Sequence, residues 1–243
     1  MRRHAAVVLV AALAAVGGSA VASGAVTQKH SVIEKRSVIQ KRSGIFAGYA
    51  VSHAGLVIKQ VSATFVVPTI TCTNDFSGVG PSVLVYSHVN ARTGSHTTSG
   101  AGVGVACENG GPFYESVMII NNHAFNDLTL HAGDTVDVTV RVVPGRSTVT
   151  LTDVTTDVSK TRSGLGQSAV QTFIGDNSVV VDGQSGQLDA FTPTQVTDVL
   201  VNSRPLGAQR PFRFQWVRQG HTLVTASPLR AGDGFTLTFR SSG

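Results

Sequence analysis

The sequence predicts an all-β protein, an antiparallel β-sandwich, and three observations support this. Val, Thr, Ser and Gly are frequent, whereas charged residues make up only 14% of the chain, which is typical of β-structure. Valines alternate strictly with polar residues from Val136 to Val142, as in a strand with one buried and one wet face. Short apolar runs are separated by Gly, Pro, Asn and Asp turns, and no stretch of ten residues holds a helical period.

Residues 1–25 have the pattern of a signal peptide. Two arginines precede an apolar run from Ala5 to Val16, and small residues offer cleavage sites after Ala22 or Ala25. A membrane anchor is the alternative, but this run is shorter than the roughly 20 residues that span a bilayer. We therefore expect a secreted protein whose mature form has no membrane span.

Residues 26–44 form a basic segment in which a hexad is repeated, HSVIEK followed by RSVIQK. A period of six fits neither a heptad coil nor one face of a helix. The segment contains two dibasic pairs, Lys35-Arg36 and Lys41-Arg42. A flexible linker, a pro-segment removed at these pairs, and a segment attracted to an anionic cell surface all remain open.

The net charge of +5 belongs to this N-terminal part of the chain. Residues 1–42 contain seven of the 19 Lys and Arg residues and one of the 14 Asp and Glu residues. The remainder therefore carries 12 basic and 13 acidic groups, a net charge of −1. A nearly neutral domain has no electrostatic footprint for nucleic acid, so we expect no nucleic-acid partner.

Residues 45–243 are expected to form one β-sandwich domain, because no linker-like change in composition interrupts them. Pro144-Gly145 predicts a hairpin between two strands of this domain. Apolar and alternating runs predict strands within residues 56–72 (interrupted at Pro68), 82–89, 134–143, 147–154, 177–183, 196–202, 212–217 and 235–240.

Cys72 and Cys107 are the two cysteines of the chain. In an exported protein the simplest expectation is a disulfide between them. Closing such a loop would stabilise the fold by about 4 kcal/mol in the chain-entropy model. A metal-binding pair is the alternative, but no cysteine or histidine lies beside either one at ligand spacing. We expect no metal and no cofactor.

The stretch GAGVGVACENGG, residues 100–111, places a glycine at every second position. A phosphate-binding loop would need a helix directly after the glycines, and no helical pattern follows. Alternation with small apolar residues predicts a strand instead, one face of which lacks side chains. The chain also lacks the G-x-S-x-G and HExxH patterns of serine hydrolases and zinc proteases.

Several segments in series resemble one known family. They read FAGYAV, VSATFVVPTITC, GVGVACENGGPFYES, LTLHAGDTVDVTVRV and TVTLTDVTT, and they occur in this order within residues 46–160. A weaker likeness continues to about residue 206. Together these segments resemble the glutamic peptidases, also called eqolisins.

This resemblance implies a fold of the concanavalin A-like lectin and glucanase type, with two seven-stranded sheets and a concave cleft. It also implies endopeptidase activity at acid pH without a metal. In the family, a glutamate acts as general base on a water, and a glutamine across the cleft orients this water and stabilises the oxyanion. This chemistry needs a carboxylate within hydrogen-bonding reach of the water and a fixed donor for the developing negative charge.

The residues expected at the two catalytic positions depart from the family. Counting back from Cys107, the glutamine position falls on Gly100, or on Ser99 or Thr98 if the register shifts. A strand that resembles Glu-Trp-Ile-Val-Glu in relatives here starts at Ser178, and only its second acid keeps a charge, as Asp182.

The aromatic positions of the cleft depart as well. A Trp-Val-Gly stretch of relatives corresponds here to Leu84-Val85-Tyr86. In relatives a segment reads Tyr-x-Ala-Trp-x-Glu. Here this segment starts at Tyr114, and its Trp and Glu correspond to Val117 and Ile119. A glycine has no side-chain amide and a serine is a poor base, so we expect that the catalytic pair is not retained.

Two hypotheses follow for the function. One is a non-catalytic protein that binds peptide or polysaccharide in the cleft that the resemblance implies. We expect this protein to be a monomer. The other is an acid endopeptidase with a relocated pair, in which Glu115 acts with Gln184 or Gln187. The cleft candidates are therefore Thr98, Ser99, Glu115 and Asp182, beside the dyad positions Gly100 and Ser178.

Overall fold

The structure is a computed structural model that describes residues 39–72, 82–90, 96–166, 168–176 and 188–241. Within this part of the chain strands dominate, and the one helix is a short 3-10 turn at Leu206–Gln209. No helix among the described residues is long and apolar enough to cross a membrane. The strands are β1 (Gln40–Ser43), β2 (Ala47–Val51), β3 (Gln60–Val66), β4 (Ile70–Thr71), β5 (Ser82–Asn90), β6 (His96–Glu108), β7 (Gly111–Ile120), β8 (His123–Phe125), β9 (Thr135–Val143), β10 (Arg146–Asp153), β11 (Val158–Gly164), β12 (Ser168–Asp176), β13 (Ala190–Phe191), β14 (Thr194–Val201), β15 (Arg204–Pro205), β16 (Phe212–Arg218), β17 (His221–Ala226) and β18 (Phe235–Phe239).

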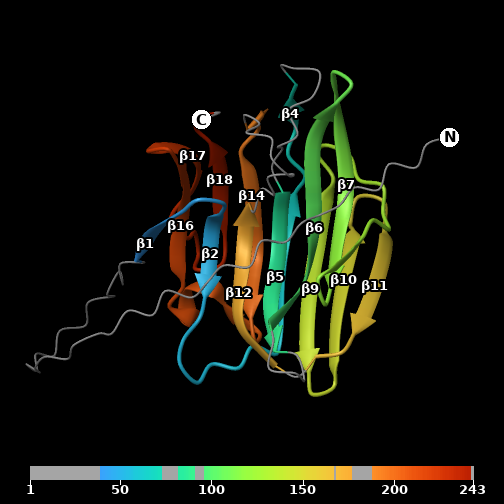
Figure 1. Ribbon diagram of the computed structural model, residues 1–243, viewed down its shortest axis with the longest axis vertical. Coiled ribbons are helices and arrows are strands. Elements are labelled where there is room, and N and C mark those ends of the chain that lie inside the picture. Colours follow the sequence, from blue (N-terminus) through green and yellow to red (C-terminus); the bar gives the residue numbers. More distant parts are fainter. Residues whose placement is uncertain (1–38, 73–81, 91–95, 167, 177–187, 242–243) are drawn as a thin grey trace, which may run out of the picture.

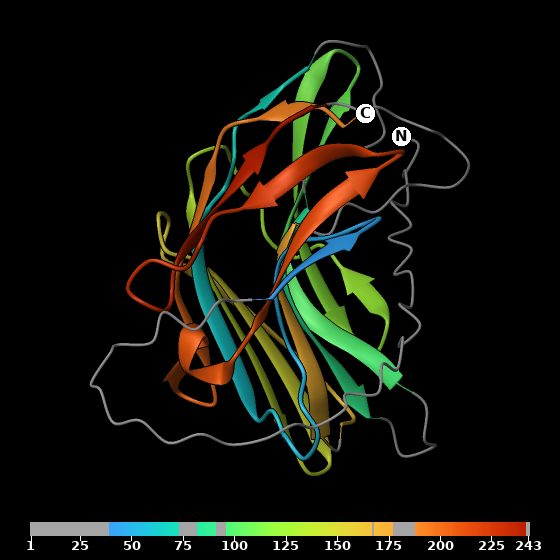
Figure 2. The ribbon, with the colours of Figure 1, turned by 90° about the vertical axis from the view of Figure 1, so that its left-hand side faces the viewer.

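The strands form two packed layers, as Figures 1 and 2 show from two directions. The back layer has the order β11-β10-β9-β3-β14-β18, and the front layer the order β16-β2-β12-β5-β6-β7-β8. β17 joins the two layers by pairing with β16 and with β18, while β4 and β13 form a separate ribbon. The layers touch where β9 and β10 lie against β5, β6 and β7. This confirms the predicted antiparallel β-sandwich.

The main core lies between the layers and follows the period of two that the sequence predicted. In β9 the four valines from Val136 to Val142 are buried, and the residues between them are exposed or half-buried. β9 and β10 form the predicted hairpin around Pro144-Gly145. Alternate residues of β5, β6 and β7, such as Val85, Ala101 and Met118, pack against these valines from the front layer.

Sheet structure begins at Gln40, five residues before the expected start of the domain. β1 pairs in parallel with β16, with Ser43 opposite Trp216. The Lys41 ammonium lies 3.9 Å from the centre of the Phe212 ring. The second dibasic pair therefore belongs to the sheet, whereas the signal peptide and the first dibasic pair lie outside the described residues.

The disulfide between Cys72 and Cys107 is present, with their Cα atoms 5.6 Å apart. It ties the chain after β4 to the end of β6, as the sequence predicted. The predicted strands near residues 60–66, 82–89, 196–201, 212–217 and 235–239 also occur. The expected strand at 177–183 lies outside the described residues. The sequence reasoning did not predict β2, β7, β11, β12 and β17 as separate strands.

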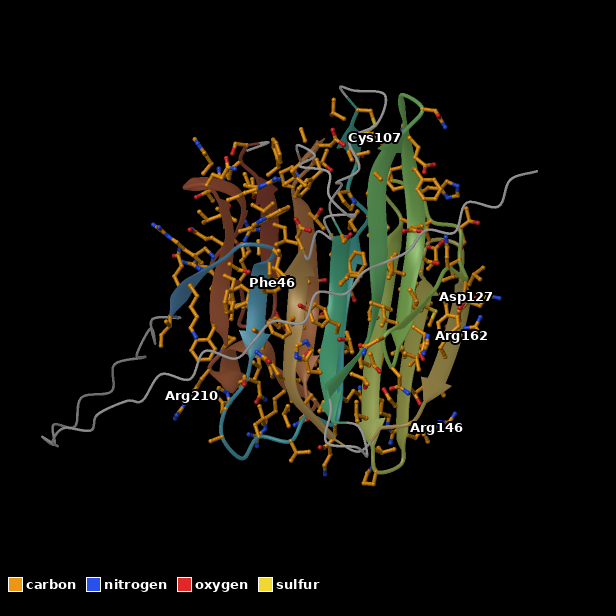
Figure 3. The ribbon with its side chains drawn as sticks, in the orientation of Figure 1. Phe46, Cys107, Asp127, Arg146, Arg162 and Arg210 are labelled. Carbon is orange, nitrogen blue, oxygen red and sulfur yellow. A yellow bond between two sulfur atoms is a disulfide. The ribbon has the colours of Figure 1, made fainter. Side chains whose placement is uncertain are left out.

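One ion pair closes the side of the sandwich where both layers end, and Figure 3 shows its two partners together. Arg162 of β11 donates from Nε to Asp127 Oδ2 at 2.7 Å and from Nη2 to Asp127 Oδ1 at 2.5 Å. The same guanidinium lies 4.7 Å from the centre of the Phe125 ring in β8. The hydrogen bond from Arg162 lowers the pKa of Asp127. These contacts of Arg162 link β11, the edge strand of the back layer, to β8, the edge strand of the front layer, and to Asp127, which follows β8.

We expect Asp127→Asn to destabilise the protein at neutral pH and to have little effect in strong acid. A lowered pKa in the folded state means that the carboxylate stabilises the fold above the ordinary Asp value of about 3.9 and loses this contribution as the pH falls further. Urea unfolding of both proteins between pH 2 and 7 measures the difference. A gap in unfolding free energy that stays constant over this range would contradict the assignment to ionised Asp127.

Candidate functional site

The outer face of the front layer carries a second, separate cluster of buried apolar side chains. Its members come from β2, β5, β7, β12 and the residue before β2, and they alternate along the strands with side chains of the main core. Outer faces of sandwich sheets are usually polar, so a buried apolar cluster marks this face as unusual. The cluster consists of Phe46, Ala50, Leu84, Tyr86, Val117, Ile119 and Phe173, with Ile45 and Phe214 packed against it.

One row of this face crosses five strands. The registers place Ile119, Gly100, Tyr86, Phe173 and Ala50 directly beside one another in β7, β6, β5, β12 and β2. The Tyr86 and Phe173 rings stack with their centres 4.9 Å apart and their planes at 14°. Burial raises the pKa of the Tyr86 hydroxyl, which therefore stays neutral. The middle of the face is thus closed by aromatic rings.

Phe46 lies next to Tyr86 and Phe173 on this face, and we call the surface formed by these three rings the aromatic floor. Its ring meets Phe173 edge-on at 5.4 Å and Phe214 at 5.7 Å between ring centres. Figure 3 labels it at the start of β2. Phe46 is 1% exposed, so its ring belongs to the buried apolar cluster of this face.

Gly100 lies in this row and has no room for a side chain. A Cβ atom built on it would be 2.3 Å from Tyr86 Cβ and 2.5 Å from the Val85 carbonyl oxygen. Real Cβ atoms do not approach other atoms so closely, and one of the two contacts is with backbone. The pairing of β5 with β6 therefore requires glycine at position 100, because the clashing atoms are the β5 backbone and the Cβ of Tyr86.

A polar row lies at one end of the face. The registers place Thr98 of β6 opposite His88 of β5, and His88 opposite Gln171 of β12. The His88 ring leans toward Phe173, with 5.3 Å between the ring centres. The row offers a hydroxyl, an imidazole and an amide, one strand spacing apart. Of these three residues, the sequence patterns predicted only Thr98 as a cleft residue. The β-branched and aromatic residues from Val170 to Ile174 are the signal in the sequence that indicates β12.

Glu115 lies at the opposite end of the face, across from Gly104. Asn126 donates from Nδ2 to Glu115 Oε2 at 3.4 Å. Burial, and after it the negative charge of Glu108, raises the pKa of Glu115. Glu115 therefore keeps its proton to higher pH than a solvated glutamate, and its ionisation as the pH rises through this raised value opposes folding.

The remaining predicted site residues lie elsewhere or outside the described part. Ser99 points to the other side of β6, between the layers, since it alternates with Thr98 and Gly100 and shares its face with Ala101. Ser99 therefore does not lie on the face that carries Gly100 and Tyr86. Ser178 and Asp182, as well as Gln184 and Gln187, fall outside the described residues. Within the described part, no three His, Cys, Asp or Glu residues gather as a metal site.

The strands β2, β5, β6, β7 and β12 carry one glutamine and two glutamates on this face, Gln171, Glu108 and Glu115. The glutamine lies too far from the glutamates for a pair of them to share one water. By register, Gln171 and Glu115 are separated by six residues along the strands and by three strand spacings. This corresponds to roughly 20 Å along the strands and about 14 Å across them. A Gln–Glu pair of the eqolisin kind cannot form from these residues.

Comparison with known proteins now identifies the family of this chain. The model of the peptidase A4 family matches residues 44–239. The chain belongs to the peptidase A4 family. This match covers both layers and the whole of the aromatic floor, and it confirms the resemblance to the eqolisins. No curated protein sequence matches the chain.

Solved structures with a similar fold include three peptidases of this kind. Scytalido-glutamic peptidase bound to a transition state analog inhibitor has a TM-score of 0.64 and 15% identity, over 81% of this chain and 98% of that one. SCP-B of the eqolisin family, in complex with the tripeptide Ala-Ile-His, has a TM-score of 0.58 and 16% identity over the same shares. Aspergilloglutamic peptidase from Aspergillus niger has a TM-score of 0.51 and 20% identity, over 66% of this chain and 98% of that one. At these identities the likeness shows the fold of this A4-family chain.

Proposed function

We propose that this member of the peptidase A4 family is a secreted protein that does not hydrolyse peptide bonds and instead binds a peptide or glycan on the outer face of its front layer. The observation that carries the proposal is the row through Gly100. The position that resembles the catalytic glutamine of the family has no side chain, and Tyr86 leaves no room for one. The same row continues into Phe173 and Ala50, which are apolar.

Catalysis by hydrolysis needs a base in reach of a water and a donor for the oxyanion. The aromatic floor provides neither group, and burial of Tyr86 and Phe173 excludes water from it. The polar groups of the face lie at its two ends, around Gln171 and around Glu115. These two ends suit contacts with a ligand more than they suit one catalytic centre.

The ligand is expected to contact His88 and Gln171 of the polar row, which are half-buried, whereas Thr98 beside them is buried. A side-chain amide such as that of Gln171 pairs with the amides of a peptide or the hydroxyls of a glycan. The SCP-B structure holds a tripeptide, and this A4-family fold suits a short peptide on the same basis. Secretion follows as a proposal from the N-terminal pattern of residues 1–25.

We expect the mature domain to leave denatured casein intact at every pH from 2 to 7, with and without pepstatin. Gel analysis over many hours would detect even slow cleavage. Calorimetric titration with casein-derived peptides and with soluble glycans would then identify the ligand class. Gln171→Ala should weaken binding at least tenfold, whereas Thr148→Ala on the exposed face of β10 should leave it unchanged.

An acid endopeptidase with a relocated pair is the second candidate, because Glu115 is half-buried on this face and has a raised pKa. Pepstatin-insensitive cleavage of casein in acid would establish this candidate and overturn the binding proposal. Loss of that cleavage in Glu115→Gln, with folding retained, would assign the base. Cleavage that persists in Glu115→Gln would place the base at another residue.

A further inference from the structure

Among the described residues, three buried serine hydroxyls lie inside the sandwich without a hydrogen-bond partner. Ser87 in β5, Ser99 in β6 and Ser147 in β10 are each 0% exposed, and their Oγ atoms have no partner in the structure. A buried hydroxyl that makes no hydrogen bond costs free energy, so native proteins rarely leave one alone. Three in one core call for a common explanation.

Two of the serines form a direct cross-strand pair. Ser87 lies opposite Ser99, and both side chains point toward the back layer on the face that carries Val85 and Ala101. The Cβ atoms of such a pair are about 5 Å apart. Their neighbour Thr172, opposite Ser87 in β12, already donates its hydroxyl to the Tyr86 carbonyl oxygen at 2.8 Å. It therefore has no second proton to offer Ser87.

The third serine comes to this place from the back layer. Ser147 lies opposite Gly164 in β11. A Cβ atom on Gly164 would be only 2.4 Å from Ile120 Cγ2, so the layers touch here. Ile120 follows Ile119, which lies opposite Gly100, so that the antiparallel register brings Ile120 beside Ser99. Ser147 and the Ser87–Ser99 pair thus belong to one neighbourhood between the layers.

Three small hydroxyl side chains meet in this neighbourhood. Sheets that pack face to face are about 10 Å apart, and a serine side chain spans only a fraction of that distance. Ser87 and Ser99 lie on the front layer here and Ser147 on the back layer, whereas other parts of the core have valine, leucine or methionine between the layers. A buried site holds a water when it offers two to four polar partners and enough room for the molecule, whereas an apolar site stays dry.

We propose that Ser87, Ser99 and Ser147 bind one internal water molecule that bridges the two layers. A buried water typically makes about three hydrogen bonds, which matches the three hydroxyls. The water would satisfy Ser87 and Ser99 at the residues directly beside Tyr86 and Gly100. It thereby supports the strand pair whose outer side forms the aromatic floor, and this role does not depend on the function proposed above.

A crystal structure at high resolution should show density for an ordered water within hydrogen-bonding distance of Ser99 Oγ and of at least one other of the three hydroxyls. Thermal unfolding gives an independent readout in Ser87→Ala, Ser99→Ala and Ser147→Ala. If water is bound, each variant leaves it with one bond fewer, and Tm should fall by roughly 2–4 °C. If the space is dry, each variant removes an unsatisfied hydroxyl, and Tm should rise.

Ser116→Ala is the matched control, because Ser116 is equally buried and its hydroxyl bonds are complete within the protein. It donates to Asn126 Oδ1 and accepts from the backbone N–H groups of Asp127 and Leu128 at 3.0 and 2.8 Å. Its Tm should fall further than that of any of the three variants. An empty space in the density, or a rise in Tm for Ser99→Ala, would overturn the proposal.

Discussion

Gly100→Ala is expected to destabilise the protein by about 2 kcal/mol or more, within the range that overpacking of a core produces. The added methyl would meet Tyr86 Cβ at 2.3 Å and the Val85 carbonyl oxygen at 2.5 Å. The backbone of β5 must move away from β6 to admit it. Urea unfolding of the variant and the parent measures the loss in free energy of unfolding.

Gly111→Ala is the matched control for this prediction. Gly111 begins β7 on the same hairpin, and a Cβ atom there would meet only the Glu108 carbonyl oxygen, at an ordinary 3.8 Å. Its effect should stay within about 0.5 kcal/mol, as is usual for surface substitutions. Equal losses in the two variants would show that Tyr86 does not close position 100.

The same contact predicts the outcome of an attempt to restore catalysis. Gly100→Gln returns the residue type that the eqolisin resemblance places at this position. It should destabilise the fold at least as much as Gly100→Ala and should yield no cleavage of casein. A stable and active Gly100→Gln variant would contradict both the steric assignment and the proposed lack of activity.

Removal of the Cys72–Cys107 disulfide is expected to cost about 4 kcal/mol of the free energy of unfolding. The bridge joins residues 35 positions apart, and its loss frees a loop of that length in the unfolded chain. The double variant Cys72→Ala/Cys107→Ala tests this by urea unfolding. The parent protein unfolded in the presence of a reductant should show the same midpoint as the double variant.

The alanine at position 107 needs a separate check, because Cys107 is fully buried and its truncation also removes packing. Unfolding of the double variant should not change when reductant is added. If reduction lowers the free energy of unfolding of the parent much less than the double substitution does, lost packing rather than the lost crosslink carries the effect. If neither loses stability, the prediction is wrong.

Much of the fold follows from local patterns. The alternation of valines in β9 and the Pro144-Gly145 turn predicted a hairpin that the structure contains. β12 escaped prediction because Ser168–Asp176 alternates less regularly: a bulge between Ala169 and Gln171 shifts its register. A bulge inserts one residue and breaks the period of two on which strand prediction rests.

The candidate site was predictable only in part. Counting along the chain placed Gly100 on the position of the family glutamine and left Ser99 as a second choice. The structure separates the two, because successive residues of a strand point to opposite faces. His88 and Gln171 were missed, since neither belongs to a motif and each becomes notable only as the neighbour of the other.

The sequence by itself determined the all-β class, the disulfide and the resemblance to the eqolisin family. These depend on composition, on spacing along the chain and on a period of two, which are local properties. Only the tertiary structure decided that β5 leaves no room for a side chain at position 100. It also decided that Gln171 and Glu115 lie at opposite ends of the face. Such contacts depend on the register between strands from distant parts of the chain, and a shift of one residue would send each side chain to the other face.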